Sequence, residues 1–194
     1  MFYTDTWVYF HVPKTSGTNI FLNAEKYGNV TKGYRYNPER HNPIWYWESK
    51  SAGNNSYKLY TTVRNPYARI VSLWNHLNYF EKATFENFIL NKLPLIHFLK
   101  GHSLMGDCRW DTTTTMFEHL SDKSGKLPDD LKVFKVESDL HDLEKELGFQ
   151  FTHTRHKSLL GKNDYKSHYT DELQEVVYNR YKKDFLEFGY YKEL

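Results

Sequence analysis

The sequence predicts an α/β fold in which helices cover both faces of a mostly parallel sheet. Three strand candidates, residues 7–12, 57–64 and 132–136, are each followed by a segment with helical spacing of its apolar residues. Strands that alternate with helices form parallel sheets, which bind ligands at the carboxyl ends of their strands. The chain has 194 residues and shows no linker or internal repeat. We therefore expect residues 1–194 to form a single domain.

The first predicted strand and helix enclose a loop that suits an anion. Residues 7–12 are rich in β-branched and aromatic side chains, and Pro13 ends the strand pairing. Thr18 is the expected N-cap of a helix with an apolar side formed by Ile20, Phe21, Ala24 and Tyr27. Between strand and helix, Lys14 and several hydroxyls meet free backbone N–H groups, an arrangement that favours phosphate or sulfate.

The two later units follow the same order. After the second strand, Asn65 and Pro66 open a helix whose apolar residues are Tyr67, Ile70, Val71, Trp74 and Leu77. After the third, Asp139 is the expected cap of a helix that Gly148 ends. Further helices are expected around residues 44–47, over 85–93 and from Thr170 onwards. Residues 95–126 read as mixed helix and loop, and 152–167 as a polar loop.

Composition and charge exclude several classes of protein. A net charge of +2 is too small for a protein that binds duplex nucleic acid. Cys108 is the only cysteine, so no internal disulfide forms, and the histidines lack the spacing of a metal site; we expect no metal. No segment reaches the roughly 18–20 apolar residues that cross a bilayer. Residues 1–5 lack the pattern of a secretory leader, which favours a cytoplasmic location.

A second anion-binding group follows the second strand. Arg64 stands at the end of that strand, and Ser72 lies further along the next helix. A guanidinium donates two N–H bonds to a phosphate, and a nearby hydroxyl adds a third. Two such groups at neighbouring strand ends predict a ligand with two phosphates. The first loop is not the usual nucleoside-triphosphate loop, because Lys14 precedes Gly17, whereas that loop requires Gly-Lys and then Ser or Thr.

These residues resemble a known family. Pro13-Lys14-Thr15-Ser16-Gly17-Thr18 is similar to the 5′-phosphosulfate loop of the sulfotransferases, and residues 63–72 resemble their 3′-phosphate motif. Weaker likenesses follow at Glu137 and at residues 184–190, which resemble the ending of the carbohydrate sulfotransferases. The matches occur in the family's order over most of the chain. Ser16 departs from the pattern, since relatives usually carry glycine there.

The resemblance implies a three-layer α/β/α fold related to the P-loop kinases, with 3′-phosphoadenosine 5′-phosphosulfate (PAPS) as the sulfuryl donor. It implies that Lys14 contacts the oxygen between phosphate and sulfuryl group, and that Arg64 and Ser72 hold the 3′-phosphate. Lys157 and Ser158, in the late polar loop, would close over the donor. The 5′-phosphate would be held by Thr15, Ser16, Gly17, Thr18 and Asn19. The implied acceptor is a hydroxyl, most simply that of a carbohydrate. Animal relatives often carry a membrane anchor, which would instead imply the Golgi lumen.

An acceptor hydroxyl is a poor nucleophile and needs a base within hydrogen-bonding reach. Related carbohydrate enzymes carry a His or Glu between the two motifs. His41 is the favoured candidate here, because an ordinary histidine pKa near 6.5 suits base work at neutral pH. Glu48 is the runner-up, with Glu39 also near in sequence, and a surface histidine without a role is the plain alternative. His11, within the first strand, is expected to pack rather than to act as the base.

Two other functions compete with this interpretation. A kinase of the same fold neighbourhood would use ATP, but the residue order of the first loop and the pair Arg64 and Ser72 argue against it. A module that binds the donor or a sulfated glycan without catalysis would lack the base. Five aromatic residues between the motifs suit stacking on sugar rings, although burial in the core explains them equally well; they are Tyr34, Tyr36, Trp45, Tyr46 and Trp47.

Overall fold

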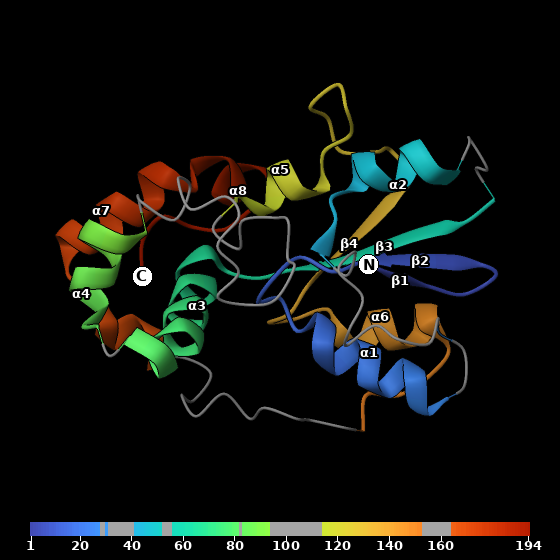
Figure 1. Ribbon diagram of the computed structural model, residues 1–194, viewed down its shortest axis with the longest axis horizontal. Helices are drawn as coiled ribbons and strands as arrows, with labels where there is room; N and C mark the ends of the chain where they lie inside the picture. The colour runs from blue at the N-terminus through green and yellow to red at the C-terminus, as the bar shows by residue number, and fades with distance from the viewer. Residues whose placement is uncertain (28–29, 31–40, 52–55, 82, 94–113, 153–163) are drawn as a thin grey trace.

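The computed structural model contains a four-stranded sheet in the order β1-β2-β3-β4 (Figure 1). Strands β2 (Trp7–Phe10), β3 (Lys58–Val63) and β4 (Leu131–Lys135) are parallel, and β1 (Phe2–Tyr3) pairs antiparallel to β2 at the edge. The structure describes residues 1–27, 30, 41–51, 56–81, 83–93, 114–152 and 164–194. The three predicted strands and their mostly parallel order are confirmed. The edge strand β1 was not predicted, because two residues are too few to show an alternating pattern.

A helix follows each parallel strand. Helix α1 (Gly17–Lys26) follows β2, α3 (Pro66–Glu81) follows β3, and α6 (Leu140–Leu147) follows β4. The remaining helical segments are α2 (Ile44–Ser51), α4 (Phe85–Asn87) with the π-helical turn Phe88–Lys92, α5 (Met116–Leu120), the 3-10 turn Asp164–His168, α7 (Asp171–Arg180) and α8 (Lys182–Glu187). The helices expected around residues 44–47, over 85–93 and from Thr170 are therefore confirmed, the second with a π-helical half.

Helix α1 begins earlier than the sequence predicted. Ser16, and not Thr18, is its N-cap, and the Ser16 side chain makes no capping hydrogen bond. The backbone N–H groups of Asn19 and Ile20 donate instead to the Ser16 carbonyl. The physical reason is a tight loop: Lys14 and Ser16 both take left-handed backbone angles, so the chain turns from strand to helix within a few residues. The predicted Thr18 cap is therefore wrong.

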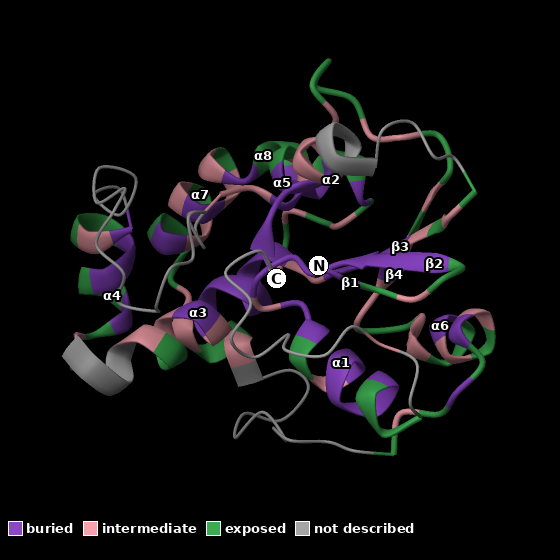
Figure 2. Cartoon of the chain, turned by 45° about the vertical axis from the view of Figure 1, so that its right-hand side comes forward, coloured by how far each residue is buried: buried purple, intermediate pink, exposed green. Residues whose placement is uncertain are grey.

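All four residues of β2 are buried (Figure 2), and its side chains alternate between two apolar cores on opposite faces of the sheet. Tyr9 packs with Phe21 of α1 and Leu143 of α6, whereas Phe10 packs with Ile44 of α2. Tyr9 lies opposite Tyr60 in β3, so the neighbouring strand continues the same face. A third cluster joins α3, α4, α7 and α8 beside the sheet. Burial on both faces explains why β2 reads as a continuous apolar run.

Candidate functional site

The two predicted anion-binding motifs meet at one edge of the sheet. Because β2 and β3 are adjacent and parallel, Lys14 after β2 and Arg64 after β3 lie at neighbouring carboxyl ends. The Arg64 Nη1 donates a hydrogen bond of 3.5 Å to the Lys14 carbonyl. Ser72, the other residue of the second predicted anion-binding group, is half-buried in the second turn of α3. The fold thus joins two motifs that are far apart in the sequence.

The loop after β2 has an unusual backbone. Lys14 has a φ of 70° and Ser16 a φ of 69°, in the left-handed region that costs an L-residue roughly 1–2 kcal/mol. Glycine adopts this conformation freely, so the glycine that the motif resemblance leads one to expect at position 16 would avoid this cost. Strained backbone of this kind persists only where surrounding contacts hold it, and it gathers at functional loops. The departure at Ser16 is therefore tolerated at an energetic cost.

Two half-buried cations, Lys14 and Arg64, share this edge. Burial, followed by the charge of Arg64, lowers the pKa of Lys14 to about 8. Burial also lowers the pKa of Arg64, while Glu137 acts in the opposite direction. The Glu137 carboxylate accepts hydrogen bonds from the Asn65 N–H at 2.8 Å and the Tyr190 hydroxyl at 3.0 Å. An anion bound beside Lys14 would be favoured, because it would offset two adjacent and partly desolvated positive charges.

Thr15 turns its side chain into the protein. Its hydroxyl donates to the Val12 carbonyl at 2.9 Å, and its own carbonyl accepts a bond of 2.5 Å from the Thr62 hydroxyl. Thr62 in turn contacts the hydroxyl of Tyr9. Thr15 is fully buried and its hydroxyl is engaged within the protein, so this side chain supports the loop itself. Thr18 is exposed and Asn19 half-buried at the start of α1.

Two histidines pack beneath the start of α1. A Cβ added to Gly17 would lie 1.9 Å from the Cδ2 atom of His11, so glycine is required for this close approach. The rings of His11 and His41 are 4.4 Å apart, and the His41 Nδ1 lies 3.2 Å from the His11 carbonyl. His11 packs as predicted. His41 is only 6 % exposed, so the alternative of a surface histidine is wrong.

Several predicted residues cannot be placed. Glu39, Lys157 and Ser158 lie outside the described residues, as do the Glu48 side chain and the aromatic residues Tyr34 and Tyr36. Trp47 packs against the rings of Tyr3 and Tyr57, which is a structural role.

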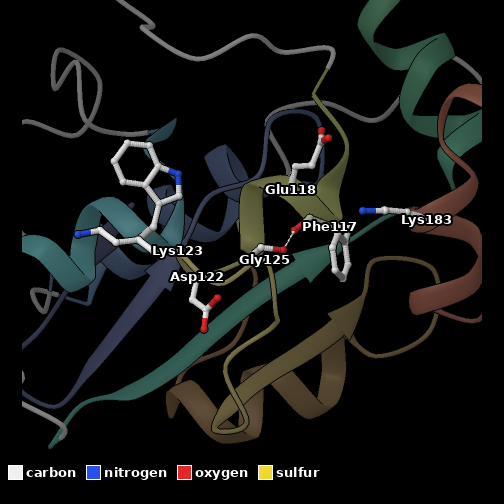
Figure 3. A pocket seen from close by; sticks show the side chains of 8 residues that line it. Phe117, Glu118, Asp122, Lys123, Gly125 and Lys183 are labelled. Atoms are coloured by element: carbon white, nitrogen blue, oxygen red, sulfur yellow. Dashed lines mark hydrogen bonds between the residues drawn. The ribbon is translucent and has the colours of Figure 1, made fainter.

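Trp45 lines a separate open pocket with Phe117, Lys123 and Lys183 (Figure 3). The Lys183 ammonium points toward the Phe117 ring, 5.1 Å from its centre. Glu118 and Asp122 also line this pocket, so its charges are mixed. No residue of the two motifs lines it.

Sequence reasoning gave no role to Arg69, although it lies in the second motif. Arg69 is 1 % exposed, and its Nε donates to the Pro13 carbonyl at 3.1 Å. The sequence does show a second charged residue between Arg64 and Ser72, but spacing alone does not tell whether this residue faces solvent or the core.

Among the described residues, no group of His, Cys, Asp and Glu side chains is arranged to hold a metal ion. Within the same residues, no helix has the length and apolar character needed to cross a bilayer.

Comparison with known proteins agrees with the motif resemblance. A family model described as "Sulfotransferase family" matches residues 1–191, which is nearly the whole chain. A search of curated proteins and a search of solved structures found no match.

Proposed function

The chain belongs to the sulfotransferase family and is a sulfotransferase enzyme, and we propose that it transfers a sulfuryl group from PAPS to a carbohydrate hydroxyl. The observation that supports the donor is the meeting of Lys14 and Arg64 at one sheet edge, joined through the Lys14 carbonyl. Two cationic groups at neighbouring strand ends suit a nucleotide that carries phosphate at both its 5′ and 3′ positions. We propose also that the arrangement of helices on both faces of the sheet is related to that of the P-loop kinases.

In the proposed reaction, the acceptor oxygen attacks sulfur in line with the bond to the bridging oxygen. A bond from the acceptor oxygen to sulfur forms, the bond from sulfur to the bridging oxygen breaks, and the acceptor proton passes to a base. The Lys14 ammonium offsets the negative charge that grows on the leaving oxygen. Backbone N–H groups of residues 15–18, which precede the first N–H bonded within α1, hold the 5′-phosphate. Arg64 and Ser72 hold the 3′-phosphate, which distinguishes PAPS from ATP.

We propose His41 as the base, with Glu48 as the runner-up. The His11 carbonyl can only accept a hydrogen bond, so the His41 Nδ1 beside it carries the proton in the neutral ring. That tautomer leaves Nε2 as the basic nitrogen. His41→Gln is then expected to lower kcat by about 100-fold or more while bisphosphate affinity stays unchanged. An unchanged kcat in His41→Gln would assign the role of base to Glu48. Absence of sulfate transfer by the wild-type protein would instead indicate a binding module without catalysis.

The donor is tested by thermal-shift titration with adenosine 3′,5′-bisphosphate, ATP and AMP. We expect the bisphosphate to raise the melting temperature most. Arg64→Ala should weaken bisphosphate binding by about 30-fold or more, because it removes a charge-assisted contact to the 3′-phosphate. Lys183→Ala, which removes an exposed cation away from both motifs, is the matched control and should bind normally. Equal or greater stabilisation by ATP would overturn the assignment in favour of a kinase.

A further inference from the structure

Arg69 is the largest fully buried side chain among the described residues. Its guanidinium donates from Nε to the Pro13 carbonyl at 3.1 Å and from Nη2 to the Thr114 carbonyl at 2.9 Å. The same group lies 5.9 Å from the centre of the Tyr181 ring. Arg69 therefore connects α3 with the loop after β2 and with the segment that leads into α5.

Asp184 of α8 faces Arg69 from the other side and is also fully buried. Its Oδ2 lies 4.0 Å from the Arg69 Nη1 and accepts the Met116 N–H at 2.9 Å. Its Oδ1 accepts the Phe117 N–H at 2.8 Å. Both carboxylate oxygens are thus engaged at the start of α5, and the carboxylate is fixed in place. Arg69 in turn has a fixed counter-charge.

Burying this pair is costly, and stability alone does not account for it. Each buried charge loses several kcal/mol of hydration, and apolar side chains of similar volume often serve stability as well or better. What an apolar side chain does not supply is a directed hydrogen bond to the Pro13 carbonyl. A planar guanidinium with several fixed N–H directions is suited to hold two carbonyls at once. The directional bonds are therefore the feature that distinguishes Arg69 from a core residue.

The held carbonyl precedes the strained residue of the site. The Pro13 C=O and the Lys14 N–H belong to one planar peptide unit and point in opposite directions. Fixing the carbonyl therefore also fixes the direction of the Lys14 N–H. Arg64 contacts the next carbonyl, that of Lys14, so two arginines of the second motif hold two successive carbonyls of the first. Such contacts are what a left-handed residue such as Lys14 needs to keep its conformation.

We propose that Arg69, oriented by Asp184, is a positioning residue that holds the donor-binding loop in the conformation required for sulfuryl transfer. This inference rests on the proposed function. Arg69 touches neither donor nor acceptor in this proposal and acts through the backbone at Pro13. Its loss displaces Lys14 relative to the leaving oxygen, and small displacements of a reacting group are costly in rate.

The test compares Arg69→Lys with Val177→Ala. Lysine keeps the charge but lacks the planar fork that spans both carbonyls. Val177 is fully buried in the cluster that also contains the apolar part of α3, so its truncation loosens the same core without touching the loop. We expect both variants to lower the melting temperature. Only Arg69→Lys should lower kcat/KM for PAPS, by about tenfold or more, with part of the loss in kcat.

Amide hydrogen exchange gives a readout that needs no donor. Backbone amides at residues 14–19 should exchange faster in Arg69→Lys and at the wild-type rate in Val177→Ala. If Arg69→Lys does not fold, Asp184→Asn is measured in the same way, because it removes the counter-charge and keeps the side-chain shape. Unchanged exchange and unchanged kcat/KM in the folded variant would overturn the inference. Wild-type protein that binds no bisphosphate would overturn the proposed function instead, while the exchange experiment still decides the role of Arg69.

Discussion

Lys14 is a residue whose chemistry depends strongly on its surroundings. A solvated lysine has a pKa near 10.4, but burial and the neighbouring Arg64 bring that of Lys14 to about 8. Near pH 8 the free enzyme is thus only partly protonated at Lys14, where the proposed reaction needs positive charge. A bound anion favours the protonated form and raises the pKa again. Protonation of Lys14 and binding of an anion beside it are therefore thermodynamically coupled, and each favours the other.

Adenosine 3′,5′-bisphosphate should bind more weakly as the pH rises above about 8. Below that value Lys14 is protonated in both free and bound enzyme, so its contribution to affinity is complete. Above it, free Lys14 must take up a proton on binding, and affinity falls by up to tenfold per pH unit until the pKa of the bound form is reached. Calorimetric titrations at pH 7 and pH 9, in two buffers that differ in ionisation enthalpy, measure both the affinity and the proton uptake.

Lys14→Met is the matched control for this titration. It removes the ammonium and keeps a flexible side chain, so its affinity should be low and should not change between pH 7 and 9. The second ionisation of a phosphate lies near pH 6 and is almost complete at pH 7, so the ligand contributes little to the slope. Wild-type affinity that is equal at pH 7 and 9 would contradict the prediction.

At the scale of elements, the unit of β2, loop and α1 shows where local signals succeed and fail. A run of β-branched and aromatic residues predicted the strand, and helical spacing of apolar residues predicted the helix. Thr18, a good capping residue by type, is exposed two positions inside the helix, because the strained loop starts the helix at Gly17. The need for glycine at that point comes from the ring of His11, which no local rule includes.

Gly17→Ala should destabilise the fold by about 1–3 kcal/mol, because its Cβ would overlap His11 and force the ring or the helix to move. In a His11→Ala background the clash disappears, so the two substitutions should be coupled by at least about 1 kcal/mol. Urea unfolding of the four proteins in the cycle measures this coupling. Gly125→Ala is the control: it has a left-handed φ of 78° but nothing within 4 Å of the added Cβ, so its cost should not depend on His11. Purely additive costs for Gly17 and His11 would refute the packing argument.

At the scale of the whole molecule, the C-terminal residues join the sheet to the helices at the edge that carries the site. The Tyr190 hydroxyl donates to Glu137 at 3.0 Å, and the Lys135 ammonium lies 4.8 Å from the Tyr190 ring centre. Two residues further on, the Lys192 carbonyl accepts the hydroxyl of Tyr67 in α3 at 2.7 Å. Tyr190 belongs to the C-terminal residues that resemble the family. Through Glu137 it supports the segment that follows Arg64.

Two adjacent tyrosines allow the contribution of these C-terminal contacts to stability to be tested. Tyr190→Phe should lower the free energy of unfolding by about 1–2 kcal/mol, because it leaves the Glu137 carboxylate with one hydrogen bond fewer. Tyr191 is 82 % exposed, so Tyr191→Phe should change it by less than about 0.5 kcal/mol. Urea unfolding followed by circular dichroism compares the two variants. Equal effects would show that the contact of Tyr190 with Glu137 does not support the fold.

Residue patterns along the chain were enough to predict the alternation of strands and helices, the two motifs at the strand ends and the family. Those features depend on periodicity and on turn residues, which are local properties of the chain. The edge strand β1, the burial of His41 and the left-handed angles of Lys14 and Ser16 depend on contacts between distant segments and became visible only in the folded chain. The tertiary structure alone also joined Arg69 to Asp184, because a buried charge pair is specified by packing between segments distant in sequence.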